Sequence, residues 1–165
     1  MRSKPLADLT RVRFALFTAL AMSVAASLSG CEGTVTGTKA LTMPLQAAPN
    51  GGFAPVKITL TPDMSPVALN FRAEQTLSPS EAGKWNRYAA TLSQNGNVRA
   101  QGEFNFNYTG SGDTAQGSTD QVQTMMMFTF AESGEFDVEI KPIKPIEVTV
   151  KDARLEARKN IQVAR

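Results

Sequence analysis

The sequence has no histidine and a single cysteine, Cys31, among its 165 residues. Without histidine the chain cannot form a Ser-His-Asp or Cys-His catalytic site, and it cannot bind zinc through imidazole. It also lacks a phosphate-binding loop and a dinucleotide-binding fingerprint. These absences do not exclude catalysis by two acids that face each other across a cleft. We therefore expect no enzyme activity, no metal site and no dissociable cofactor.

The first 30 residues have the pattern of a secretory signal. Four basic residues and one acid lie within Met1–Arg13, and apolar or small residues fill positions 14–28. A basic start followed by an apolar run and small residues is typical of a segment that is removed from the mature protein. The alternative is a membrane-spanning helix, but the run is shorter than the ~20 residues that a span needs.

The segment Leu28-Ser29-Gly30-Cys31 closes this apolar run. It resembles the lipobox of bacterial lipoproteins, whereas an ordinary secretory signal without lipid would need no cysteine here. The resemblance implies cleavage before Cys31 and acylation of Cys31, so that two or three acyl chains hold the protein at a membrane. In Gram-negative lipoproteins an Asp after the cysteine favours the inner membrane. Glu32 in this place favours the outer membrane, with the protein facing the periplasm.

The mature chain would be slightly acidic and of single-domain size. The leader holds four of the 17 basic and one of the 15 acidic residues, which leaves 13 basic and 14 acidic residues in about 135 positions. No overall basic surface is available for nucleic acid, so we expect no nucleic-acid partner. Residues 31–55 are rich in Gly, Thr, Ala and Pro, which predicts a flexible tether after the lipidated cysteine, with a short edge strand at 34–36 as the alternative for that part. Residues 56–165 would form the domain.

That domain shows alternating apolar and polar residues in short runs, which predicts strands with one buried face. Asn95-Gly96 predicts a tight hairpin, because both central residues of a type I′ turn need a positive φ. The runs cover 56–61, 67–74, 87–93, 98–108, 122–130, 136–140, 146–150 and 155–163. About seven or eight such strands indicate an all-β, antiparallel sandwich, with a small β-barrel as the alternative.

The segment 132–138, Glu-Ser-Gly-Glu-Phe-Asp-Val, resembles the corner that precedes the penultimate strand of immunoglobulin-like domains. Phe136 stands where that corner has a Tyr, and Val138 stands where antibody domains have a Cys. The resemblance implies an immunoglobulin-like β-sandwich.

Two sets of side chains are candidates for exposed surfaces. If Met126 faces the core, Met125 and Met127 face outward and form an apolar strip for a partner. The acids at 135, 137 and 139 and the charges at 154, 156 and 158 would also face outward, and they would pair across the sheet if their strands are neighbours.

One end of the sandwich is expected to collect the remaining candidates. If every connection reverses the chain, the loops at 75–86 and 109–120 lie side by side with Trp85 between them, and the connector at 141–145 joins them. The residues predicted at this end are Trp85, Lys84, Asp113, Asp120, Lys141 and Lys144. Our first expectation for function is a lipid-anchored envelope protein that binds a protein partner or supports an assembly. The alternative is a binder of cell-wall glycan or another small envelope ligand.

Overall fold

The computed structural model describes residues 37–77, 79–107 and 117–162, and Cys31 and Asp113 lie outside these ranges. Eight strands and two short 3₁₀ turns, η1 and η2, are present in the described part of the chain, and no α-helix. The strands are β1 (Thr38–Pro44), β2 (Phe53–Leu60), β3 (Val67–Leu77), β4 (Trp85–Gln94), β5 (Asn97–Asn107), β6 (Gly117–Phe128), β7 (Gly134–Pro142) and β8 (Val150–Lys159). The 3₁₀ turns are Pro62–Met64 (η1) and Pro79–Glu81 (η2).

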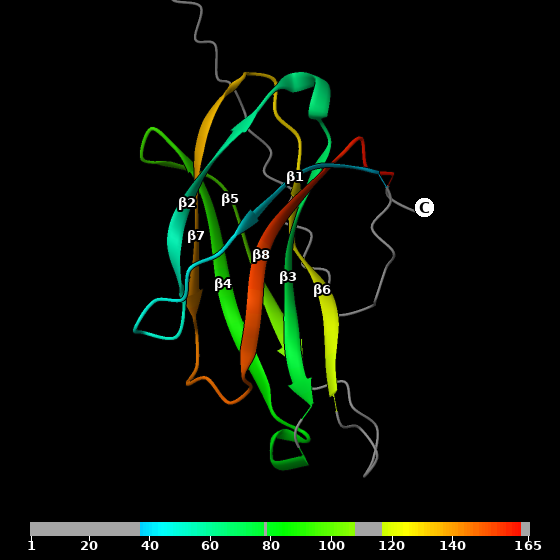
Figure 1. The fold of residues 1–165 in the computed structure, drawn as a ribbon. Helices are drawn as coiled ribbons and strands as arrows, with labels where there is room; N and C mark the ends of the chain where they lie inside the picture. Colours follow the sequence, from blue (N-terminus) through cyan, green and yellow to red (C-terminus); the bar gives the residue numbers. More distant parts are fainter. Residues whose placement is uncertain (1–36, 78, 108–116, 163–165) are drawn as a thin grey trace, which may run out of the picture.

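The strands form two four-stranded antiparallel sheets that pack face to face (Figure 1). One sheet has the order β1-β8-β3-β6 and the other the order β2-β7-β4-β5. The predicted antiparallel β-sandwich is therefore confirmed, and the two sheets are not closed into one barrel. In an immunoglobulin constant domain the last strand joins the sheet of the penultimate one. Here β8 lies instead beside β3, and β2 takes the place next to β7.

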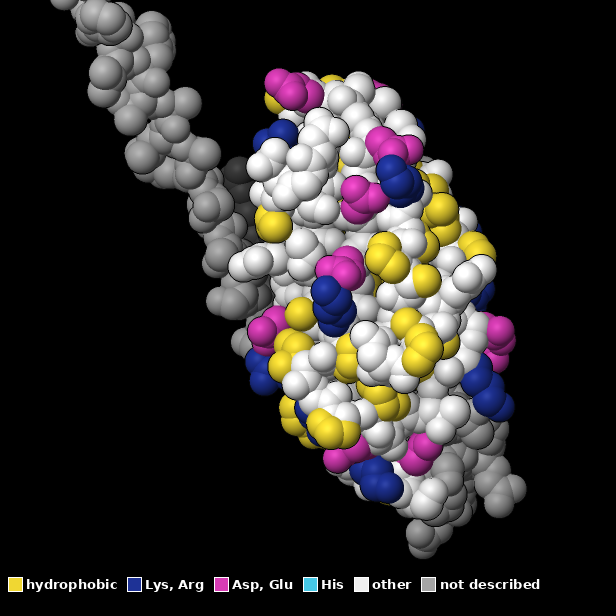
Figure 2. Space-filling view, turned by 90° about the vertical axis from the view of Figure 1, so that its left-hand side faces the viewer, with side chains coloured by type: hydrophobic (Ala, Val, Ile, Leu, Met, Phe, Trp, Pro, Cys, Tyr) yellow, Lys and Arg dark blue, Asp and Glu magenta, His cyan; other side chains and the backbone are white. Residues whose placement is uncertain are grey.

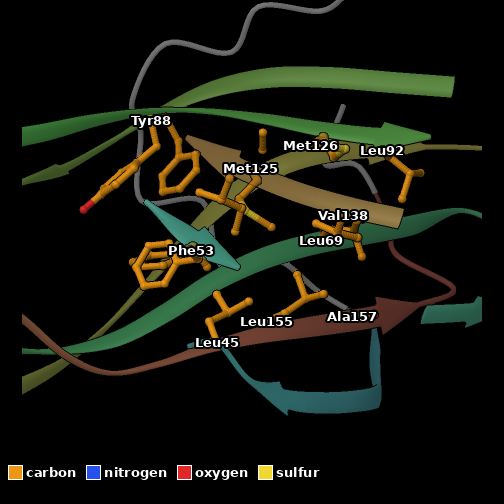
Figure 3. Close-up of a cluster of buried hydrophobic side chains, with 14 of the residues drawn as sticks. Leu45, Phe53, Leu69, Tyr88, Leu92, Met125, Met126, Val138, Leu155 and Ala157 are labelled. Atoms are coloured by element: carbon orange, nitrogen blue, oxygen red, sulfur yellow. The ribbon is translucent and has the colours of Figure 1, made fainter. Parts of the chain in front are cut away.

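The core lies between the sheets and follows the alternation in the sequence. On β4 the buried side chains are Asn86, Tyr88, Ala90 and Leu92, and the residues between them face outward. Figure 3 shows side chains of both sheets meeting in this layer. The hairpin between β4 and β5 is also as predicted, since Asn95 and Gly96 have φ values of 52° and 77°.

The expected tether at 31–55 is wrong over its described part. Residues 38–44 form β1, which pairs with β8 at the edge of the sheet, and the chain then contributes Leu45 and Phe53 to the core. The alternation of Leu41 and Met43 is weak as a signal, because an edge strand is exposed along much of its length. At the other end of the chain, the strand expected at 146–150 is a connector, and β8 begins at Val150.

Met125 is buried, contrary to the predicted outward strip. The register of β3 with β6 shifts between Leu69 and Asn70, where Met125 is the extra residue. Such a bulge turns two successive side chains to one face, so Met125 and Met126 both enter the core, with 4% and 7% of their surface exposed. Met127 is exposed as predicted.

The Met125 bulge also joins the edges of the two sheets. A Cβ atom placed on Gly102 of β5 would lie closer to the backbone oxygen of Met125 than real Cβ atoms ever approach a neighbour. Gly102 therefore permits β5 and β6 to come together along one side of the sandwich.

We predict that Gly102→Ala lowers the free energy of unfolding by about 1–3 kcal/mol, because the added methyl group must push β6 away. Urea denaturation measures the change. The matched control is Gln101→Ala, whose side chain is exposed on the same strand and which should change stability by under ~0.5 kcal/mol. Equal stability of the Gly102 variant and the wild type would show that β5 and β6 are not in this close contact.

Candidate functional site

Different turns and loops lie at the two ends of the sandwich. We call the end with η2, residues 82–84 and the β7–β8 connector (143–149) the distal end. The opposite end, where the described chain begins at Gly37, is the proximal end; it also holds η1 and the loop at 129–133. The register fixes this division, because Thr38 pairs with Lys159 while the start of β8 pairs with Gln75 (Figure 1).

Trp85 and Lys144 meet at the distal end. Trp85 is the first residue of β4 and lies on the outer side of its sheet, opposite the buried Asn86. The Nζ atom of Lys144 lies 3.8 Å from the centroid of the indole ring, which is a cation–π contact. Most of the loop at 109–120, which was predicted beside Trp85, lies outside the described residues. Trp85 forms part of an outer surface with the connector.

Glu147 completes this group. Lys144 Nζ donates a hydrogen bond of 2.6 Å to Glu147 Oε2. That bond lowers the pKa of the Glu147 carboxyl, and the charge of Lys144, the backbone N–H of Trp85 and the charge of Lys84 act in the same direction. The distal end thus presents an indole ring, an ammonium group and an ionised carboxylate in contact, with the exposed Lys84 beside them.

Lys141 and Asp120, which were also predicted for this site, have other ion-pair partners. Lys141 forms an ion pair of 2.8 Å with Glu139 on the surface of β7. Asp120 belongs to the other sheet, where its carboxylate pairs with Arg72 at 2.5 Å and Arg154 at 3.5 Å. Asp120 and Trp85 therefore lie in opposite layers of the sandwich, which the predicted reversal of the chain at each connection did not specify.

The two predicted rows of outward charges also do not face each other, since β7 and β8 lie in different sheets. Glu135 and Asp137 pair instead with Lys57 of β2, at 2.5 and 3.8 Å. Figure 2 shows the side that carries β2 and β7, where hydrophobic side chains are scattered among charged ones.

On the opposite sheet, Glu156 is 2% exposed and lies between Arg72 at 3.4 Å and Arg158 at 3.2 Å. A carboxylate this well covered needs such partners, because removing one would leave an uncompensated buried charge. Arg72 and Arg158 therefore compensate the buried charge of Glu156.

Asn86 is the residue that holds the site together, and the sequence pattern did not reveal it. It is fully buried, and its side-chain oxygen accepts hydrogen bonds from the backbone N–H groups of Glu147 and Val148, at 2.9 and 3.0 Å. Its Nδ2 group donates to the Val148 carbonyl oxygen at 2.8 Å. One side chain thus satisfies three backbone groups of the connector.

A second clamp joins η2 to the connector. Glu81 Oε1 accepts hydrogen bonds from the backbone N–H of Thr149 at 3.1 Å and from its hydroxyl at 2.8 Å. Ile143 is tied as well, because its N–H donates to the Arg87 carbonyl oxygen at 2.8 Å. The connector that carries Lys144 and Glu147 is therefore held at both ends and in the middle.

Tyr88 adjoins Asn86 on the inner face of β4. It is 1% exposed, and its hydroxyl oxygen accepts a hydrogen bond of 3.2 Å from Asn86 Nδ2. Burial disfavours the phenolate and raises the pKa of Tyr88 to about 12, an effect that the hydrogen bond from Asn86 reduces only partly.

The raised pKa of Tyr88 predicts a loss of stability in alkali. The folded chain holds the phenolic proton of Tyr88 more tightly than the unfolded chain, in which the pKa of this group is near 10. The stability that this difference contributes is therefore complete below pH 10 and is lost as the pH rises toward 12. Between pH 9 and pH 11 the wild type should lose about 1 kcal/mol more than Tyr88→Phe, which retains the other tyrosine. Urea denaturation at both pH values measures this difference. Parallel losses in the two proteins would contradict the assignment.

Comparisons of the sequence with protein-family models and with curated proteins find no match. Within the described ranges, no helix is long and apolar enough to cross a membrane. Nor do those ranges contain a group of three or more Asp, Glu, Cys or His side chains placed to hold a metal ion. The functional argument therefore starts from the geometry of the distal end.

Proposed function

We propose that this chain is a lipid-anchored bacterial envelope protein whose sandwich is a non-catalytic module that binds a protein partner through its distal end. The anchor would be Cys31, at a membrane whose periplasmic side the domain faces. The outer membrane is the preferred one, because Glu32 follows the cysteine. The partner surface would be built around Trp85, Lys144 and Glu147.

The position of β1 is the observation that carries this proposal. Because β1 runs from the proximal end toward the distal end, the chain that leads from Cys31 joins the domain at the end remote from Trp85. The ten residues of β4 imply a separation of roughly 30 Å between the ends. Cys31 lies six positions before Gly37, and this stretch of chain reaches at most about 20 Å. A lipid on Cys31 would thus keep the proximal end near the membrane and leave the distal end free.

The composition of the distal surface supports a protein partner. The connector exposes Ile143, with 46% of its surface accessible, one residue before Lys144 in the chain. Interface centres are enriched in aromatic residues, whereas isolated charges belong to the rim. A fixed indole ring with charged groups around it, and an exposed apolar residue on the same connector, fit that arrangement.

Recognition of a glycan is the second candidate, and the cation–π contact argues against it. A sugar ring would stack on a face of the indole, and Lys144 Nζ occupies one face at 3.8 Å. The same ammonium group is also bonded to Glu147, so stacking on that face would have to break both contacts.

Photo-cross-linking tests the proposed surface. We predict that a benzophenone amino acid at Ala82, which is exposed at the distal end, captures an envelope protein in living cells. The same group at the exposed Ala131 of the proximal end should not capture this protein. In the protein that carries the benzophenone amino acid at position 82, Trp85→Ala should remove the adduct, because loss of an aromatic anchor typically costs above ~2 kcal/mol of binding free energy.

Thermal unfolding of the Trp85→Ala protein is the control. Since Trp85 is only partly buried, its removal should cost less stability than the ~3–5 kcal/mol of a core aromatic residue. An adduct that persists in folded Trp85→Ala protein, or that forms equally from Ala131, would show that the partner binds elsewhere.

A further inference from the structure

A cavity of about 310 Å³ opens beside Tyr88, on the inner side of the connector. This volume is within the range of small-molecule sites. No Lys, Arg, Asp or Glu lines it, and most of its walls are apolar. The lining residues are Ala47, Gly51, Gly52, Phe53, Tyr88, Ile146, Val148, Thr149 and Val150.

Both walls of this cavity are held by hydrogen bonds. One wall is the loop between β1 and β2, where Ala48 N–H donates to the Gly52 carbonyl oxygen at 2.9 Å and Gly51 N–H to that of Ala48 at 3.0 Å. This loop packs directly on the connector, because a Cβ atom on Gly51 would lie 2.5 Å from Ile146 Cγ1. The other wall is the connector itself, which Asn86 and Glu81 fix. The cavity is therefore preformed.

Tyr88 supplies the polar group of this cavity. Its oxygen accepts a bond from Asn86, but among the described residues its hydroxyl proton has no acceptor, whereas the Thr149 hydroxyl already donates to Glu81. Figure 3 shows the Tyr88 oxygen at the margin of the cluster, beyond the ring that lies beside Phe53. A buried hydroxyl donor without an acceptor favours a ligand that brings one.

We propose that this cavity binds a neutral, mostly apolar small molecule that carries one acceptor oxygen, such as a carbonyl group, and that Tyr88 donates a hydrogen bond to that oxygen. The apolar part of the ligand would lie against Phe53, Ile146 and Val148. A charged ligand is disfavoured, because the lining offers no counter-charge. This inference does not depend on the proposed partner surface, which lies on the outer side of the same connector.

The test compares acetophenone with ethylbenzene, which has a similar shape but no acceptor oxygen. Two-dimensional NMR of the ¹⁵N-labelled mature chain, produced from residue 31 with Cys31→Ser and therefore without leader or lipid, follows the amides of Gly51, Gly52 and Val148 during titration. We expect saturable shifts of these amides, with acetophenone binding roughly three- to tenfold more tightly than ethylbenzene, the size of one neutral hydrogen bond. In Tyr88→Phe the two probes should bind equally.

A second variant keeps the test decisive if Tyr88→Phe does not fold. Ala47 lines the cavity and is exposed, so Ala47→Trp should fill the cavity and abolish the shifts from both probes. Ala131→Trp at the proximal end is the matched control and should leave them unchanged. The proposal is overturned if neither probe shifts these amides at millimolar concentration. It is also overturned if Ala47→Trp leaves binding intact, or if the preference for acetophenone survives in Tyr88→Phe.

Discussion

The packing of Phe71 against aromatic rings of the opposite sheet is the contact on which the rest of this structure depends. Phe71 lies on β3, and its ring centroid is 5.3 to 5.8 Å from those of four rings. These rings belong to Phe53, Tyr88, Phe104 and Phe106, and they come from three strands of the other sheet. Since neither sheet can bury its apolar face alone, this cluster fixes how the two layers sit on each other. It also determines where β4 places its next inward residue toward the distal end, Asn86.

The distal end depends on that core through β4. Tyr88 packs against Phe71, Asn86 follows two residues earlier on the same face, and the three hydrogen bonds of Asn86 hold the connector. The outer side of the connector then carries Lys144 over Trp85, while its inner side forms a wall of the cavity. Binding surfaces on loops work when a rigid scaffold positions them, and here β4 holds the connector through the buried amide side chain of Asn86 and the backbone carbonyl oxygen of Arg87. A change in the core should therefore alter the geometry of both the proposed partner surface and the cavity.

The sequence predicts most strands of this fold but not how they are distributed between the layers. Period-two alternation locates β2 to β7 because each has one face in the core, and Asn95-Gly96 locates its hairpin. Alternation does not reveal the edge strand β1, because little of that strand is buried. It also misplaces Met125, because the bulge inserts one extra residue and interrupts the period of two. Alternation is the same in either sheet, and reversal of the chain at each connection predicts the end at which a residue lies but not its layer, so the prediction did not separate Asp120 from Trp85. Asn86 was missed because its partners are 61 and 62 positions away.

The central claim is that the chain is anchored at the proximal end and presents the distal end away from the membrane. Its most direct test is fluorescence quenching in vesicles whose lipid headgroups carry a quencher. A dye is attached to Ala131→Cys or to Ala82→Cys; the proposed lipid on Cys31 would block that thiol and leave the introduced cysteine as the reactive one. The account predicts strong quenching of the dye at 131, weak quenching at 82, and neither when Cys31→Ser removes the anchor. Equal quenching at both positions, stronger quenching at 82, or quenching that survives Cys31→Ser would contradict it.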